Sequence, residues 1–305
     1  MRPPELAISH DDQHAAVDLT GGGLRAYAAG GRDVLDGYGP DEESTSGRGQ
    51  VLIPWPNRLE DGTYEFNGTR HELPLTEPDR GNAIHGLVRR KRWTVAEHVP
   101  ERIALEHALE PQPGYPFSIA LTVEYTLSAI GLGVRSTAAN VGSETCPYGA
   151  GFHPYLTSGT QTVDTAGLRI PARTVLISDE RGLPIGEQSV DQAGLDFRQP
   201  RQIGSTVLDH AFTDLDRDDD GLARVELVDS QHGAVSTLWV DETFSFLMVF
   251  TGDPLSDVAR RSLAVEPMTC PPNAFRTGDH LIRLEPGASA TSAWGITPAR
   301  LDRSG

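Results

Sequence analysis

The chain has few cysteines, little positive charge and no long apolar run, and each shortage excludes a class of protein. Its 305 residues include two cysteines, Cys146 and Cys270, which form no Cys-x-x-Cys motif. So few thiols are typical of a reducing compartment, and we expect a cytoplasmic protein. Lysine and arginine total 26 against 43 aspartates and glutamates, a net charge of −17. This charge repels phosphate backbones and anionic lipids, so we expect no nucleic-acid or membrane partner.

Several motifs and patterns are also missing. No stretch approaches the roughly 18 apolar residues of a membrane-spanning helix, and the N-terminus lacks the apolar segment of a signal peptide. Sustained helical periodicity is absent, and only residues 254–261 are expected to form a short helix. The sequence contains no Gly-x-Ser-x-Gly, Walker, His-Glu-x-x-His or dinucleotide-binding motif. These absences exclude the commonest hydrolases, nucleotide-binding proteins and metalloproteases.

What is present predicts short strands. The chain has 32 glycines and 22 prolines, and residues 121–128 alternate apolar and polar side chains. Hairpins are expected over 17–28 and 64–70, the second around an Asn-Gly turn, and residues 281–284 are expected to pair with 289–295. Further strands are expected at 225–228, 234–240 and 244–250. We therefore expect an all-β fold, a large antiparallel β-sandwich with sheets packed face to face, in one domain of residues 1–305.

Three segments could contribute side chains to a catalytic site. His153 lies in a glycine- and proline-flanked segment, residues 149–156, that predicts a tight, exposed corner between strands. Asn57 and Arg58 follow two prolines and should project from an irregular, fixed segment. Glu266 ends an apolar strand, where partial desolvation would raise its pKa toward that of a general base. Spacing alone does not distinguish this role from a strand-end carboxylate paired with an arginine.

Two charged runs have simpler interpretations. Residues 216–221 begin like a calcium-binding loop, but Leu227 stands where the bidentate glutamate belongs, so a solvated acidic turn is favoured. Residues 89–92, Arg-Arg-Lys-Arg, are more typical of a solvated charged face than of an anion site.

Five short motifs in order resemble the aldose 1-epimerase (galactose mutarotase) family, and they cover most of the chain: Asn57-Arg58, then residues 82–86, 151–155, 208–212 and 264–267. The resemblance implies a β-supersandwich that interconverts the α and β anomers of a free aldose. It implies no cofactor and no metal. The only implied partner is a small-molecule sugar. Separately, we expect a monomer or a homodimer.

The resemblance also implies roles for individual residues. Glu266 corresponds to the general base on the anomeric hydroxyl, and His153 corresponds to the general acid on the ring oxygen. The implied substrate-binding residues are Asn57, Arg58, His85 and Asp209. These groups suit the reaction, since opening a hemiacetal requires removing the O1 proton while O5 is protonated.

Two departures leave alternatives open. Met248 stands where the family often has a glutamine, which puts the sugar preference in doubt. Residues 85–89 are also similar to the His-Gly-x-x-Arg of hexose-6-phosphate 1-epimerases, so that activity is an alternative, as is a non-catalytic carbohydrate-binding β-sandwich. We expect unphosphorylated hexoses to be preferred, because residues 89–92, if they form a strand, would direct at most two side chains to one site.

Overall fold

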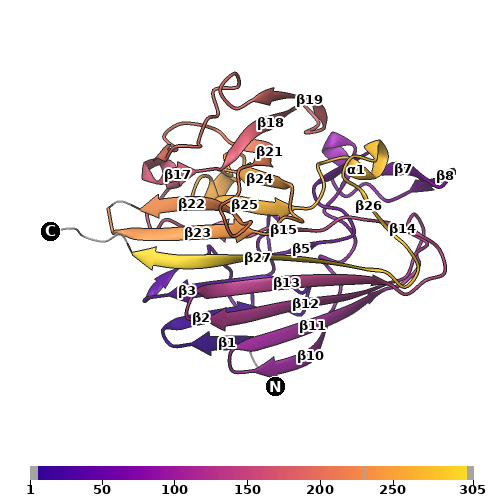
Figure 1. The fold of residues 1–305 in the computed structure, drawn as a ribbon, viewed down its shortest axis with the longest axis horizontal. Helices are drawn as coiled ribbons and strands as arrows, with labels where there is room; N and C mark the ends of the chain where they lie inside the picture. The colour runs from indigo at the N-terminus through magenta and orange to yellow at the C-terminus, as the bar shows by residue number, and fades with distance from the viewer. Residues whose placement is uncertain (1–5, 230, 301–305) are drawn as a thin grey trace.

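The computed structural model describes residues 6–229 and 231–300, and its fold is an antiparallel β-sandwich (Figure 1). The larger sheet has nine strands in the order β10-β11-β12-β13-β27-β23-β22-β17-β20. These strands are β10 (Thr94–Val99), β11 (Arg102–Leu109), β12 (Ile119–Ser128), β13 (Gly131–Asn140), β27 (Ser289–Arg300), β23 (Ala234–Val240), β22 (Ala223–Asp229), β17 (Gly167–Arg169) and β20 (Arg201–Gln202).

The second sheet has eight strands in the order β19-β18-β21-β24-β25-β15-β5, with β16 also paired to β25. Its strands are β19 (Pro184–Ser189), β18 (Ala172–Ser178), β21 (Asp209–Leu215), β24 (Phe246–Phe250), β25 (Leu263–Met268), β15 (Gly151–Phe152), β16 (Tyr155–Leu156) and β5 (Val51–Leu52).

Smaller elements complete the described fold. A four-stranded sheet contains β1 (Leu6–His10), β2 (Gln13–Val17), β3 (Leu24–Ala29) and β4 (Arg32–Asp33). The two-stranded pairs are β6 (Arg58–Glu60) with β9 (Asn82–Ile84), β7 (Thr63–Phe66) with β8 (Thr69–Glu72), and β14 (Cys146–Tyr148) with β26 (Ile282–Leu284). The helical turns are η1 (Pro78–Arg80), η2 (Val163–Thr165), η3 (Ser256–Val258) and α1 (Ala274–Thr277).

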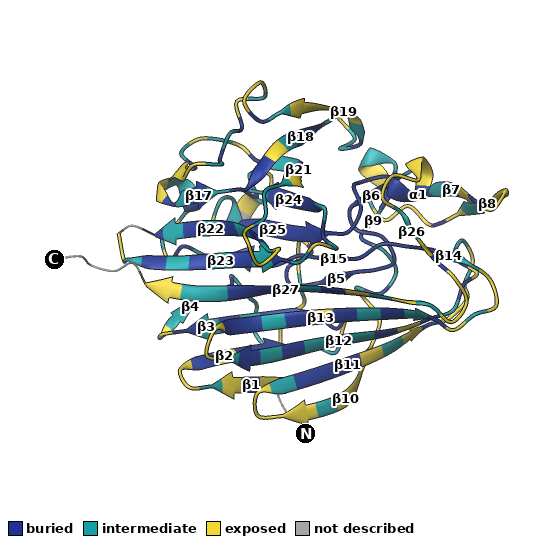
Figure 2. Ribbon diagram, viewed as in Figure 1, coloured by how far each residue is buried: buried dark blue, intermediate teal, exposed yellow. Residues whose placement is uncertain are grey.

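The alternation of apolar side chains explains why the two large sheets pack together. Every second residue of β12 is buried, and Figure 2 shows this banding along the strand. A buried aromatic contact joins the sheets, because the rings of Phe152 on β15 and Trp294 on β27 lie 5.4 Å apart between centroids. Burying such large rings is a main source of stability in a sandwich.

The structure confirms most of the predicted strands and corrects one predicted strand pairing and one predicted helix. The hairpins β2–β3 and β7–β8 form as expected, the second around Asn67 and Gly68. The pairing predicted for residues 281–284 is wrong: β26 pairs with β14, whereas β27 pairs with β13 and β23. The short helix predicted over residues 254–261 is also wrong, because this segment contains only the 3₁₀ turn η3. The α-helical turn α1 was not predicted.

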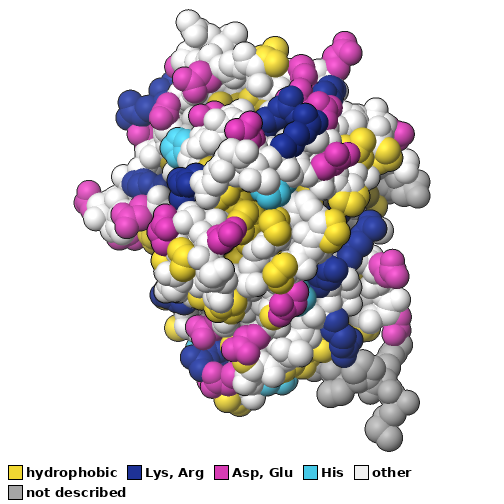
Figure 3. Space-filling view, turned by 90° about the vertical axis from the view of Figure 1, so that its right-hand side faces the viewer, with side chains coloured by type: hydrophobic (Ala, Val, Ile, Leu, Met, Phe, Trp, Pro, Cys, Tyr) yellow, Lys and Arg dark blue, Asp and Glu magenta, His cyan; other side chains and the backbone are white. Residues whose placement is uncertain are grey.

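Acidic and basic side chains are interspersed on the face shown in Figure 3. In the acidic turn of residues 216–221, Asp218 and Asp220 both pair with Arg224, which agrees with a solvated turn rather than a calcium loop. Among the residues described, no helix is both long and apolar enough to cross a membrane.

Candidate active site

The register of the eight-stranded sheet brings His153 and Glu266 together. Strands β15 and β16 both pair with β25 in antiparallel register, at Gly151–Met268 and Tyr155–Ala264 respectively. His153 lies midway between Gly151 and Tyr155, and Glu266 lies midway between Met268 and Ala264, so the two residues are directly opposite. Side chains of directly opposed residues lie on the same face of a sheet, with Cβ atoms about 5 Å apart. Residues distant in sequence thus become cross-strand neighbours.

The same register extends this row across the sheet. Glu266 is opposite Met248 on β24, and Met248 is opposite Ala211 on β21. A second row, two residues along each strand, contains Tyr155, Ala264, Phe250 and Asp209. These two rows face the same side, since side chains alternate with a period of two. They form the floor of a cavity.

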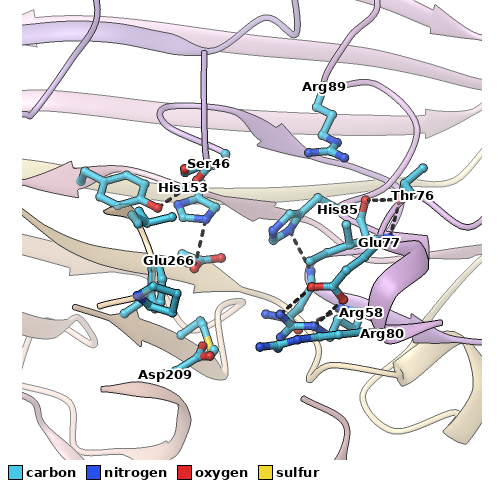
Figure 4. Close-up of a pocket in the computed structure, with 18 of the residues that line it drawn as sticks. Ser46, Arg58, Thr76, Glu77, Arg80, His85, Arg89, His153, Asp209 and Glu266 are labelled. Atoms are coloured by element: carbon cyan, nitrogen blue, oxygen red, sulfur yellow. Dashed lines mark hydrogen bonds and ion pairs between the residues drawn. The ribbon is translucent and has the colours of Figure 1, made fainter. Parts of the chain in front are cut away.

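That cavity has a volume of about 440 Å³, within the range of small-molecule sites. All six residues singled out from the sequence line it: Asn57, Arg58, His85, His153, Asp209 and Glu266. Figure 4 shows His153, Glu266 and Asp209 on one side of the cavity, with His85, Arg58 and Arg80 on the other. The fold therefore brings together six residues that come from five separate segments of the chain.

The His153–Glu266 pair is the most buried ionisable contact in the cavity. His153 Nε2 lies 3.3 Å from Glu266 Oε1, and the two side chains are 6% and 3% exposed. The other polar atom of each side chain, His153 Nδ1 and Glu266 Oε2, is buried and has no hydrogen-bond partner among the described residues. The expectation that His153 occupies an exposed corner is wrong, because the second row and the loop at Gly47 cover its ring.

Burial shifts both groups toward their neutral forms. Burial, and secondly the negative charge of Asp209, raise the pKa of Glu266 well above its usual value, although Arg58 partly offsets them. Burial, followed by the positive charge of Arg48, lowers the pKa of His153 to about 3. Both shifts favour the neutral forms, a protonated carboxyl and an imidazole without an added proton, so the pair favours holding a single proton between two groups that are in contact.

His85 is oriented by the backbone. The backbone N–H of Asn57 donates to His85 Nδ1 at 3.2 Å, so the ring proton belongs on Nε2. Asn57 has a φ of 55°, and its side-chain oxygen accepts a hydrogen bond from the backbone N–H of Arg58 at 2.9 Å. This left-handed position, which asparagine tolerates, fits the irregular segment predicted there. With these two hydrogen bonds made, the amide NH₂ of Asn57 and the Nε2–H of His85 remain as hydrogen-bond donors.

Arg58 is held by a residue that the sequence did not indicate. Its Nε and Nη2 atoms donate to the two carboxylate oxygens of Glu77 at 2.8 and 3.0 Å, and Asn82 donates to Glu77 as well. Only Nη1 of Arg58 remains, and this atom packs so closely on Gly182 that a side chain there would overlap it. Arg58 is therefore held in a partly buried, bidentate ion pair with Glu77.

Stacked groups support the His153 ring from behind. The Tyr155 ring lies parallel to it, with a 7° interplanar angle and 4.9 Å between centroids, and the Arg48 guanidinium lies 4.4 Å from the Tyr155 centroid. Arg48 in turn pairs with Asp36 at 3.0 Å. Arg48 and Asp36 were missed from the sequence, where nothing distinguishes them from other surface charges.

One nitrogen of His85, one nitrogen of His153 and one carboxylate oxygen of Glu266 lie within 4.8 Å of one another, close enough to be ligands of one metal ion. A metal bound to His85 Nε2 would require the ring proton on Nδ1, where it would oppose the Asn57 N–H. Two donors would then face each other without an acceptor. This donor set therefore suits acid–base chemistry better than metal binding.

Comparisons with known proteins give a consistent result. The family model described as aldose 1-epimerase matches residues 4–297. The uncharacterized protein YihR of Escherichia coli (strain K12) is 35% identical over 92% of this chain and 89% of its own length. A GalM/aldose epimerase homologue from C. elegans has a similar structure, with a TM-score of 0.87, 18% identity and coverage of 98% and 99% of the two chains. A putative aldose 1-epimerase from Escherichia coli K12 superposes with a TM-score of 0.83, 22% identity and coverage of 98% and 99%.

Proposed function

The chain belongs to the aldose 1-epimerase family, and from this premise we propose that it interconverts the α and β anomers of a free hexose by acid–base opening and closure of the ring. The observation that carries the proposal is the buried contact between His153 and Glu266, at 3.3 Å on the floor of a sugar-sized cavity. Hemiacetal opening requires a base that removes one proton and an acid that supplies another. Glu266 and His153 can fill these roles, because they lie on the same face of the sheet and each has a buried polar atom without a hydrogen bond.

In this mechanism Glu266 accepts the proton of the anomeric hydroxyl while His153 donates a proton to the ring oxygen O5. The C1–O5 bond breaks, C1 becomes an aldehyde, and rotation about C1–C2 exposes its other face. Reclosure reverses both proton transfers, so the pair ends with the same number of protons. A pair that holds one proton has the required total, whether that proton rests on Glu266 or on His153 before the sugar enters.

The other lining residues suit a polyhydroxylated ring. His85 Nε2–H and the Asn57 amide supply donors, and Asp209 supplies an acceptor. Met248 and Phe250 give the floor an apolar part on which the C–H face of a sugar ring can pack. Met248 also adjoins Glu266 in the sheet and offers it no strong hydrogen bond, which fits the raised pKa of this carboxyl.

Polarimetry of freshly dissolved α-glucose and α-galactose tests the proposal. The protein should accelerate the decay of optical rotation, and Glu266→Gln should lower kcat about 10²–10⁴-fold, because the amide keeps the shape but cannot accept a proton. A near-normal rate in Glu266→Gln would remove Glu266 from the role of base. No acceleration of any sugar by the folded wild-type protein would favour the carbohydrate-binding alternative.

The remaining expectations extend the same proposal. We propose a monomer or homodimer that acts in the cytoplasm on a small sugar, without a cofactor. Equilibrium sedimentation would measure the oligomeric state directly.

A further inference from the structure

A buried cation lies behind the His153 ring and outside the cavity. The guanidinium of Arg48 lies 4.4 Å from the centroid of the Tyr155 ring, and that ring is parallel to the imidazole of His153. Arg48 is 4% exposed and is not among the residues that line the cavity. It can therefore act on the imidazole through Tyr155 and through its charge, but not by touching a bound sugar.

The charge of Arg48 is only partly neutralised. Its Nη2 donates to Asp36 Oδ2 at 3.0 Å, but the same carboxylate also binds Arg261 at 2.9 Å and accepts a hydrogen bond from Ser262 at 2.7 Å. Two guanidinium groups thus share one carboxylate, and the positive charge exceeds the negative charge in this cluster. Arg48 Nε is also buried without a hydrogen-bond partner among the described residues. Keeping such a cation in the interior is unfavourable unless it has a role besides pairing with Asp36.

The loop that carries Arg48 is bonded to both ring-bearing residues. The backbone N–H of Gly49 donates to the carbonyl of His153 at 2.8 Å. The hydroxyl of Tyr155 donates to the carbonyl of Ser46 at 2.9 Å, and Figure 4 shows Ser46 beside His153. The guanidinium, the phenol and the imidazole are therefore held in a fixed order.

The charges near the His153 ring act on its protonation in two directions. Burial, followed by the positive charge of Arg48, lowers the pKa of His153 to about 3. A carboxylate such as Asp209 favours the imidazolium and acts against Arg48. The titratable or charged groups near the ring, besides Arg48, come from several elements: Glu266 on β25, Tyr155 on β16, His85 after β9, Asp209 on β21 and Arg89 in a turn at residues 89–90.

None of these groups can replace Arg48. Burial raises the pKa of Tyr155 and lowers the pKa of His85 well below its usual value, so both rings are neutral at neutral pH. The charge of Arg89 acts on His153 in the same direction as Arg48, but more weakly. Arg89 also lines the cavity, from a turn rather than from the strand considered in the sequence. Arg48 is thus the cation that acts most strongly on His153 without belonging to the sugar site.

A second proton on the His153–Glu266 pair would stop the proposed reaction. An imidazolium beside a carboxylic acid could still donate a proton to O5, but no base would remain to accept the proton of the O1 hydroxyl. A fixed positive charge behind the ring opposes this second proton, because it destabilises the imidazolium.

We propose that Arg48 is a positioning residue that, anchored by Asp36, holds the Tyr155–His153 stack and confines the pair to a single proton in acid solution, so that Glu266 remains able to act as the base. This inference rests on the proposed anomer interconversion. It adds to that reaction a residue that contacts neither the sugar nor the reacting atoms.

The test measures kcat against pH by polarimetry of α-glucose or α-galactose, with circular dichroism at each pH to identify the range in which each variant is folded. In Arg48→Gln and Arg48→Met the acid-side fall of kcat should begin about one pH unit higher than in the wild type, the smaller end of the usual effect of a nearby charge. KM at neutral pH should not change, since Arg48 does not line the cavity. Arg48→Lys keeps the charge and should restore the wild-type acid limit.

Arg261→Met is the matched control. It removes a cation from the same carboxylate, but the Arg261 side chain is 46% exposed, so solvent screens its charge and the acid limit should not move. In the Arg48 variants Asp36 keeps Arg261 and Ser262 as partners, so no unpaired carboxylate is left behind and these variants should fold.

Each outcome decides a separate point. Acid limits that coincide in the wild type, Arg48→Gln and Arg48→Met would overturn the inference and leave anomer interconversion intact. An equal shift in Arg261→Met or in Arg48→Lys would show that the fixed charge of Arg48 is not the cause. Failure of both neutral variants to fold would assign Arg48 a structural role and overturn the inference. No acceleration of either sugar by the folded wild type would overturn the proposed function itself.

Discussion

Gly47 should be essential for catalysis although it carries no functional group. Its φ of 76° is unfavourable for other residues, and a Cβ atom added there would lie 2.4 Å from His153 Cδ2 and 2.8 Å from Nε2. Carbon atoms pack no closer than about 3.5 Å, so the Gly47→Ala methyl must displace the imidazole by about 1 Å. The ring is held by Tyr155 on one face and Glu266 at Nε2, so this displacement directly disturbs the proposed general acid.

The expected magnitudes separate stability from catalysis. A left-handed alanine costs roughly 1 kcal/mol of folding free energy relative to glycine. A misplacement of about 1 Å in a catalytic group costs on the order of 10²-fold in rate. Gly47→Ala should therefore remain folded, with a modestly lower Tm, while its kcat falls about a hundredfold.

Gly68→Ala is a matched control for this experiment. Gly68 has nearly the same φ, 75°, but it lies in the turn between β7 and β8, where nothing is within 4 Å of the position that an alanine methyl would take. Thermal unfolding should show a loss of Tm in both variants, larger in Gly47→Ala because its methyl also overlaps the buried His153 ring, whereas polarimetry should show lost kcat only in Gly47→Ala. Equal kcat values in the two variants would mean that the ring does not depend on this close contact, and the geometric argument for His153 would fail.

Three further predictions concern the acid, the base and their surroundings. His153→Ala should mainly lower kcat, whereas His85→Ala should mainly raise KM. The reason is that protonation of O5 matters in the transition state, whereas binding of the hydroxyls matters in both the ground state and the transition state. Steady-state polarimetry measures both constants, and a change in KM alone for both variants would contradict the prediction. Because the pKa of Glu266 is raised, the contribution of this carboxyl to folding stability is full at acid pH and is lost as pH rises through that pKa. The difference in Tm between Glu266→Gln and the wild type, in favour of the variant, should therefore be larger at pH 8 than at pH 4. Met248→Gln should place an amide hydrogen-bond donor beside Glu266 and lower the pKa of this carboxyl. Activity is expected to fall at alkaline pH, where the pair gives up its proton, and in this variant the fall should begin at a lower pH. An unshifted pH profile would count against the one-proton mechanism.

The sequence predicted local structure well where neighbouring residues determine it. The alternation of residues 121–128 and the Asn67-Gly68 turn depend on side chains close in sequence, and both appear as expected. The partner of residues 281–284 was wrong because a short strand beside Pro286 and Gly287 resembles half of a hairpin. Its actual partner, β14, lies far away in the sequence, and no local pattern indicates it.

The six candidate residues came from short motifs and a family resemblance, not from spacing. What the sequence could not supply is the environment of each group. Nothing near Arg58 in the chain indicates that Glu77 occupies two of its donors, and nothing near His153 indicates the stack of Tyr155 and Arg48 behind it. Such partners are fixed by tertiary packing, which also made His153 buried where an exposed corner was expected.

The unsatisfied atoms of the His153–Glu266 pair favour an enzyme over a binding module. Leaving a buried polar atom without a hydrogen bond costs about 1–3 kcal/mol, and this pair leaves one such atom on each partner, His153 Nδ1 and Glu266 Oε2. A sandwich that only holds a sugar can do so with neutral amides and hydroxyls, without burying two ionisable groups 3.3 Å apart. The cost is understandable if the carboxyl and the imidazole must exchange protons with a bound ring. Strained or unsatisfied groups concentrated at one point of a well-packed sheet are expected where chemistry, rather than stability, determines the residues.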